Sequence, residues 1–96
     1  MVLLGRAHGW LAEVELSRDQ PDEALRLAEA GLEVSTRHGY LYDAALCTRA
    51  RGEALVALGD RALALHALDD AAAQFAAIGA EPELARTQDA IAATQM

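Results

Sequence analysis

His66 and Asp70 have the residue types and the spacing of a pair of metal ligands. Residues four apart share one face of a helix, so both side chains could reach the same ion. A protein zinc site needs three or four ligands, and no cluster of histidine or cysteine accompanies this pair. A solvated histidine beside a carboxylate is the favoured interpretation, and no metal is expected.

Cys47, the single cysteine of the chain, is the natural candidate for a nucleophile. Its thiol would need a neighbouring base or positive charge to ionise. Its place on the apolar side of a predicted helix favours a small buried residue instead. His8 and His38 stand beside glycines near helix ends, and the sequence has no glycine-rich phosphate loop and no serine elbow. We therefore expect no catalytic residue, no cofactor and no enzyme activity.

Arg49 and Glu53 are also four residues apart, and two interpretations stay open. They can form an ion pair within one helix, which contributes about 0.2 to 0.5 kcal/mol. Alternatively, they belong to a groove of mixed charge that holds a peptide carrying both charge signs.

The charge of the chain excludes several partners. Fifteen acidic residues against eight basic ones, all of them arginine, give a formal net charge of -7. No basic stripe is visible, so direct binding to nucleic acid is not expected, and a membrane surface is disfavoured for the same reason. The apolar run at residues 2–4 is cut short by Gly5 and Arg6, which leaves no signal-peptide core and no membrane span. We expect a cytoplasmic protein.

The elements that must position these side chains follow from an internal repeat. Sliding the sequence against itself by 40 residues superimposes six identical pairs, among them Glu13 on Glu53 and Gly39 on Gly79. Similarity at a fixed period of this length is typical of stacked helical hairpins, each burying its apolar face against its neighbours. The alanine-rich composition with few aromatic residues favours an all-α fold.

Turn signals predict about five helices. Pro21 and Pro82 each stand at a helix start, Gly39 and Gly79 each follow a helix end, and Gly59 is followed by the N-capping Asp60. The predicted helices span about residues 3–18, 21–38, 40–58, 61–78 and 81–94. Their apolar spacing predicts inward positions, which in the first and third helices include Leu4, Ala7, Leu11, Val14 and Leu41.

These residues resemble the tetratricopeptide repeat family. The second copy matches the family spacing at Gly52, Leu55, Gly59, Ala64, Leu68 and Ala71. The first copy is looser, with Ala12, Ala24, Ala28 and Gly31 at equivalent positions and Asp19 where the family has a turn glycine. The period of 40 residues exceeds the usual 34. In this respect the sequence is similar to the long-helix variant of the family, which occurs in bacterial multidomain signalling proteins and transcriptional regulators.

The resemblance implies one domain over residues 1–96, built as a right-handed α-solenoid of antiparallel helical hairpins. The first repeat would cover about 3–39, the second about 40–79, and a half-repeat or capping helix about 81–95. Its function would be non-catalytic protein recognition on the concave face, as part of a larger bacterial regulatory or signalling protein. Carried over by position, the partner-binding residues would be Arg6, Glu13, Ser17, Leu46, Arg49, Glu53, Arg86 and Asp89.

Two features of the sequence leave alternatives open. Trp10 and the aromatic residues of the run Tyr40–Tyr42 could anchor a partner. We favour the alternative, in which they pack between adjacent hairpins. The apolar residues of the first helix, Leu4 and Leu11 among them, favour either additional repeats in a longer parent chain or a homodimer. The less favoured alternative is a small helical enzyme that binds metal through His66.

Overall fold

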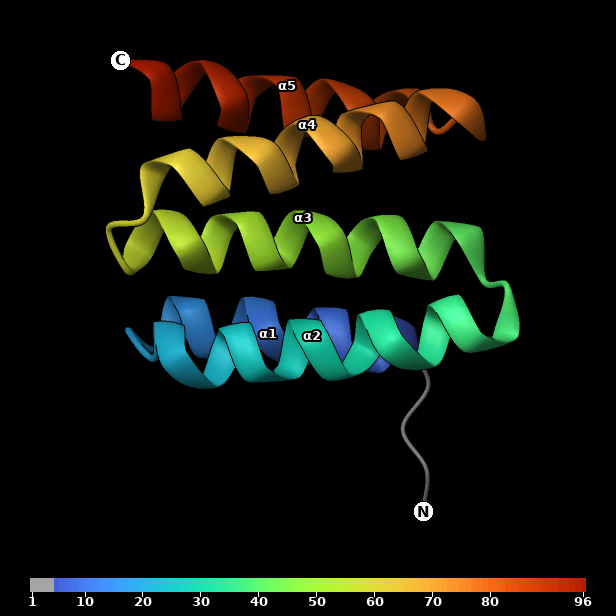
Figure 1. Ribbon diagram of the computed structural model, residues 1–96, viewed down its shortest axis with the longest axis horizontal. Coiled ribbons are helices and arrows are strands. Elements are labelled where there is room, and N and C mark those ends of the chain that lie inside the picture. Colours follow the sequence, from blue (N-terminus) through green and yellow to red (C-terminus); the bar gives the residue numbers. More distant parts are fainter. Residues whose placement is uncertain (1–4) are drawn as a thin grey trace.

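The chain forms five α-helices over the residues described by the computed structural model, 5–96 (Figure 1). They are α1 (Gly5–Ser17), α2 (Pro21–His38), α3 (Leu41–Ala57), α4 (Arg61–Ala77) and α5 (Glu81–Gln95). Consecutive helices run antiparallel, and within this part of the chain there is no strand. The all-α prediction is confirmed, and the predicted helix bounds that fall within the described residues differ from the observed ones by about one residue.

The four connections share one backbone geometry. Asp19, Gly39, Gly59 and Gly79 all have positive φ, and they recur every 20 residues. After each, the next N–H donates to a carbonyl five residues back, as Tyr40 does to Ser35 at 2.9 Å and Asp60 to Leu55 at 3.0 Å. This is the Schellman helix ending, which satisfies carbonyls that the helix leaves open. The same residue stands at the N-cap position of the next helix, so each turn is only a few residues long.

α3 occupies the centre of the fold. It contacts α2 and α4, its neighbours in sequence, and also α1 and α5. No Cα atom of α2 lies within 8 Å of a Cα atom of α4, because α3 lies between these two helices. Nine residues of α3 are buried, whereas α5 has a single buried residue, Thr87.

Small residues allow this close packing. Alanines from α1, α2 and α3 form one cluster with Leu27, and Ala45 and Leu46 of α3 meet Ala71 and Phe75 of α4 in another. At Gly52 a Cβ atom would lie 2.8 Å from two side-chain atoms of Leu68, so α3 and α4 approach more closely there than a larger residue allows.

The exposed side of α1 differs from the prediction. Leu11 is 39% exposed and Val14 is 48% exposed, whereas Gly9 and Ala12 on another side are buried. Leu41 is also exposed, although its spacing predicts an inward position. Helical spacing groups residues on a face, but it does not say which face a neighbour covers. Among the described helices, α1 contacts α2 and α3, and these two leave Leu11 and Val14 exposed. Leu4 lies outside the described residues, as does the start of the predicted first helix.

None of the described helices is long and apolar enough to cross a membrane.

Candidate functional site

Arg49 is the charged centre of a surface made by α1, α3 and α5. It projects from α3 and is 2% exposed. Its Nη1 donates a hydrogen bond to Glu83 of α5, and its Nη2 donates one to Glu13 of α1 at 3.3 Å. Its Nε lies 3.4 Å from Glu53, one turn further along α3. One guanidinium group therefore connects three helices through three carboxylates.

The Phe75 ring forms the base beneath this guanidinium group. Arg49 Cζ lies 5.5 Å from the ring centroid, at a distance where a cation is attracted by the π face. Phe75 is completely buried. The charge is therefore enclosed by an aromatic ring on one side and carboxylates on the others.

The surroundings shift the pKa values of two members of this cluster. Burial alone would lower the pKa of Arg49, but the hydrogen bond with Glu83 and the carboxylate charges outweigh it, and the pKa is raised. Burial raises the pKa of Glu53, and the nearby charge of Glu13 adds to this, while Arg49 and Arg86 oppose it. Arg49 is thus firmly charged, whereas ionised Glu53 is held in a less favourable environment than water.

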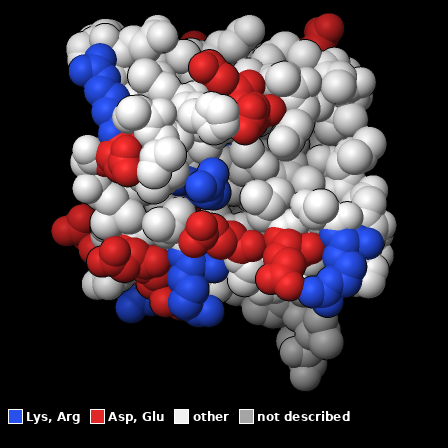
Figure 2. Space-filling model, in the orientation of Figure 1, with Lys and Arg blue, Asp and Glu red and all other residues white. Residues whose placement is uncertain are grey.

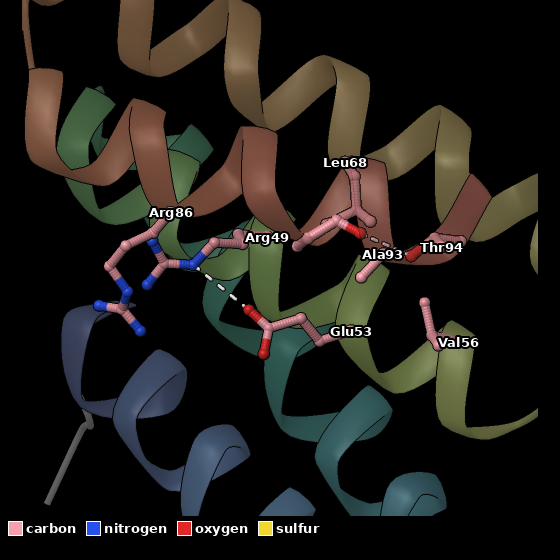
Figure 3. A pocket seen from close by; sticks show the side chains of 8 residues that line it. Arg49, Glu53, Val56, Leu68, Arg86, Ala93 and Thr94 are labelled. Carbon is pink, nitrogen blue, oxygen red and sulfur yellow. Dashed lines mark hydrogen bonds and ion pairs between the residues drawn. The ribbon is translucent and has the colours of Figure 1, made fainter. Parts of the chain in front are cut away.

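Two hollows flank the Arg49 cluster. The larger has a volume of about 350 Å³ and lies between α3 and α5, with Leu68 of α4 at its base and Val56 and Ala93 among its walls (Figure 3). Arg49, Glu53 and Arg86 line it as well. The smaller, about 130 Å³, lies on the other side of Arg49, towards α1. It is lined by Arg6, Trp10, Glu13, Tyr42, Leu46, Arg49, Glu83 and Arg86.

Six of the eight residues predicted for partner binding line these hollows: Arg6, Glu13, Leu46, Arg49, Glu53 and Arg86. Ser17 and Asp89 line neither. The Ser17 hydroxyl donates to the Val14 carbonyl at 2.7 Å, one turn back in its own helix. Asp89 is exposed on α5.

Arg49 lines both hollows, but its charge is covered by its partners. Its guanidinium group is enclosed by its ion pairs and does not project into solvent. The cations that a partner can reach are Arg86, whose side chain is 62% exposed, and Arg6, which is 50% exposed. Arg6 also pairs with Asp43 at 3.0 Å and lies over the Tyr42 ring.

Sequence reasoning did not single out Glu83, although it closes the cluster from α5. The 40-residue repeat offers a signal, because Glu83 is equivalent to Asp43. Both carboxylates stand in the first turn of a helix and pair with an arginine of the preceding odd-numbered helix, Asp43 with Arg6 and Glu83 with Arg49.

The other candidates for chemistry stand apart from this surface. His66 Nε2 lies 3.6 Å from Asp70 Oδ2 on the exposed side of α4. Among residues 5–96, no three potential metal ligands come together. Cys47 is completely buried, and burial, together with the charge of Asp43, raises the pKa of its thiol to about 11. That thiol is protonated at neutral pH, which is the opposite of an activated nucleophile.

The aromatic run makes ring contacts within the fold but is only partly covered, since Tyr40 is 45% exposed and Tyr42 is 36% exposed. The Tyr42 ring meets the Phe75 ring edge to face at 6.2 Å, and Tyr40 stacks on His38 at 5.6 Å. Trp10 is 59% exposed and lines the smaller hollow.

Comparison with protein-family models, with curated proteins and with solved structures finds no match for this chain. The function is therefore argued from the geometry of this surface.

Proposed function

We propose that this protein is a non-catalytic interaction scaffold of the tetratricopeptide type, a right-handed α-solenoid that binds a peptide or protein segment on the face formed by α1, α3 and α5. The observation that carries the proposal is the pair of hollows on either side of Arg49, where apolar side chains lie beneath charged rims, with Leu68 in the larger hollow and Leu46 in the smaller one. The contacts of α3 with both α1 and α5 support the stacked arrangement. By the resemblance, the domain belongs to a larger bacterial regulatory or signalling protein.

The residues around the larger hollow define the partner. Its apolar wall accepts an aliphatic or aromatic side chain, since contact with Leu68 and Val56 removes apolar surface from water. Arg86 stands at the rim and lies 3.6 Å from Glu83, but its side chain is 62% exposed and can also bind a carboxylate next to that apolar side chain. The partner segment therefore carries a large apolar residue beside an aspartate or glutamate.

A displayed library of random peptides tests this proposal. Peptides selected on the purified protein should be enriched in an apolar residue next to an acidic one, and in NMR spectra they should shift amide signals of α3 and α5. Ala93→Trp fills the larger hollow and should weaken binding at least tenfold. Ala92→Trp is the matched control, because Ala92 is exposed on the same helix and does not line the hollow.

Circular dichroism on both variants separates loss of binding from loss of fold. Selected peptides that bind Ala93→Trp as tightly as the wild type, or that shift only signals of α2 and α4, would contradict the proposal.

A second candidate function is self-association through α1. Trp10, Leu11 and Val14 lie within about one turn of this helix, and each is more than a third exposed. An apolar patch of this kind is typical of an interface. Sedimentation at increasing concentration should reveal a dimer that Leu11→Glu dissociates, whereas Ser17→Glu, with the same change of charge, should not. A monomer at all concentrations would exclude this candidate.

A further inference from the structure

A third cavity lies away from the Arg49 cluster and shares no lining residue with the two hollows beside it. It has a volume of about 310 Å³ and lies where α2 ends, α3 begins and α4 ends. Residues from the end of α2 and from the end of α4 face each other across it, and α3 lies between these two helices. Its volume is at the lower end of the range for small-molecule sites.

The walls of this cavity are mainly apolar and carry no charge. Tyr40, Leu41, Ala77 and Ile78 supply apolar surface, and no residue that lines the cavity is acidic or basic. Figure 2 shows charged side chains gathered mainly along α2 on this side of the molecule, with an uncharged area where the turn after α2 and the end of α4 lie. An ionised ligand would find no counter-charge here, so the occupant is neutral.

One buried oxygen atom in the cavity lining, Oε1 of Gln74 on α4, lacks a hydrogen-bond partner. Ser35 of α2 also lines the cavity and is completely buried, but its hydroxyl group interacts with the Cys47 thiol. Buried acceptors are nearly always satisfied in folded proteins, because an unsatisfied one costs about 1 to 3 kcal/mol.

From these observations we propose that this cavity binds a small neutral molecule with an apolar body and an N–H or O–H donor. The apolar body packs against Leu41 and Ile78, and the donor is directed at Gln74, whose terminal amide rotates with little cost. Leu41, 67% exposed, gains cover when the site is filled. The proposal stands independently of the function proposed for the α1, α3 and α5 face.

Indole and N-methylindole are the probes that test it, because they share an apolar bicyclic body and differ in one N–H donor. Addition of indole up to about 5 mM, a range appropriate to a ligand of this size, should shift the NMR amide signals of Gly39, Tyr40 and Ile78 in a saturable way. Indole should bind about two- to tenfold more tightly than N-methylindole, the ratio expected for one hydrogen bond. Gln74→Leu should abolish that ratio.

Two further variants locate the site. Ala77→Phe fills the cavity and should eliminate binding of both probes. Ala76→Phe makes the same change at the neighbouring exposed position, which does not line the cavity, and should leave binding intact. The proposal is overturned if no saturable shift occurs, if binding survives Ala77→Phe, or if the wild-type protein binds both probes equally. The comparison of the two probes on wild-type protein tests the proposal even if a variant fails to fold.

Discussion

Arg49 combines burial with three carboxylate partners, and the partners are not equivalent. Glu83 reaches Arg49 from α5 in a direct hydrogen-bonded ion pair, whereas Glu53 belongs to the same helix as Arg49 and lies at 3.4 Å. A buried charge is strongly destabilising when a partner is removed, because the remaining charge stays desolvated. The contribution of each carboxylate therefore depends on how well it compensates Arg49 and on how much it costs to bury.

We predict opposite responses to the loss of charge at Glu83 and Glu53. Glu83→Gln should lower the free energy of unfolding by about 1.5 to 3 kcal/mol, the range for a hydrogen bond to a charged group. Glu53→Gln should leave stability at pH 7 unchanged or raised, since the raised pKa of Glu53 means that its ionised form is disfavoured in the fold. Urea unfolding measures both.

The same raised pKa fixes the sign of the pH dependence. Because folded Glu53 holds its proton more tightly than the unfolded chain does, wild-type stability relative to Glu53→Gln should rise as the pH falls through the folded pKa towards 4.5. If Glu53→Gln lowered the free energy of unfolding at pH 7 more than Glu83→Gln does, the conclusion that Glu83 stabilises the fold more than Glu53 would be wrong.

Cys47 provides a second titration, at high pH. The pKa of its thiol is raised from 9.0 to about 11, so the unfolded chain loses the proton first as the pH rises. The stability that the buried neutral thiol contributes is complete below pH 9 and is lost progressively towards pH 11. By about pH 10 the loss should be about 1.4 kcal/mol. Cys47→Ala should lack this part of the pH dependence. If the free energy of unfolding of both proteins changed in parallel between pH 9 and pH 11, the thiol would not be shielded from solvent in the fold.

At the level of elements, the helix bounds could be predicted because their signals are local. Proline at a helix start and glycine after a helix end act within a few residues, and Asp60 caps α4 by accepting from the Leu63 N–H at 3.2 Å, as its type predicts. Even Asp19, which stands where the other three turns have glycine, adopts their left-handed conformation.

What the sequence left open depends on contacts between helices. The apolar residues of α1 share a face, but whether Leu11 and Val14 are covered depends on a neighbouring helix. The Arg49 and Glu53 pair could be predicted from its spacing, whereas the burial of Arg49 and its bond to Glu83 require the distance between α3 and α5. Six of the site residues that the resemblance implies do line the hollows.

Helix spacing yields a paired prediction at two glycines. Gly52→Ala would place a Cβ atom 2.8 Å from Leu68 and 3.3 Å from the Ala64 carbonyl, and overpacking of this kind costs about 1 to 3 kcal/mol. Gly9→Ala meets its nearest atoms at 3.7 Å, an ordinary contact. Both variants gain up to about 1 kcal/mol of helix propensity, so Gly9→Ala should stabilise the protein and Gly52→Ala should destabilise it. Thermal unfolding compares them, and a gain of stability in both would show that α3 and α4 can move apart.

For the whole molecule, α3 connects the other four helices. Buried residues are concentrated in α3, and each of the other four helices packs against it. Units at the ends of stacked helical arrays have one neighbour fewer and lose structure more readily. Local stability should therefore decrease from α3 towards α5, even though the turns at both ends have the same geometry.

Amide hydrogen exchange in the native state tests this order. Amides of α3 should exchange only through global unfolding, with protection equal to the full free energy of unfolding, whereas α5 should open separately at lower cost because Thr87 is its single buried residue. The ion pair from Glu83 to Arg49 connects α5 with α3, so Glu83→Gln should accelerate exchange in α5 more than in α2, which has no part in the pair. Equal protection of α3 and α5, or equal acceleration in α2 and α5, would mean that the five helices open as one unit and that the Arg49 cluster does not hold α5 in place.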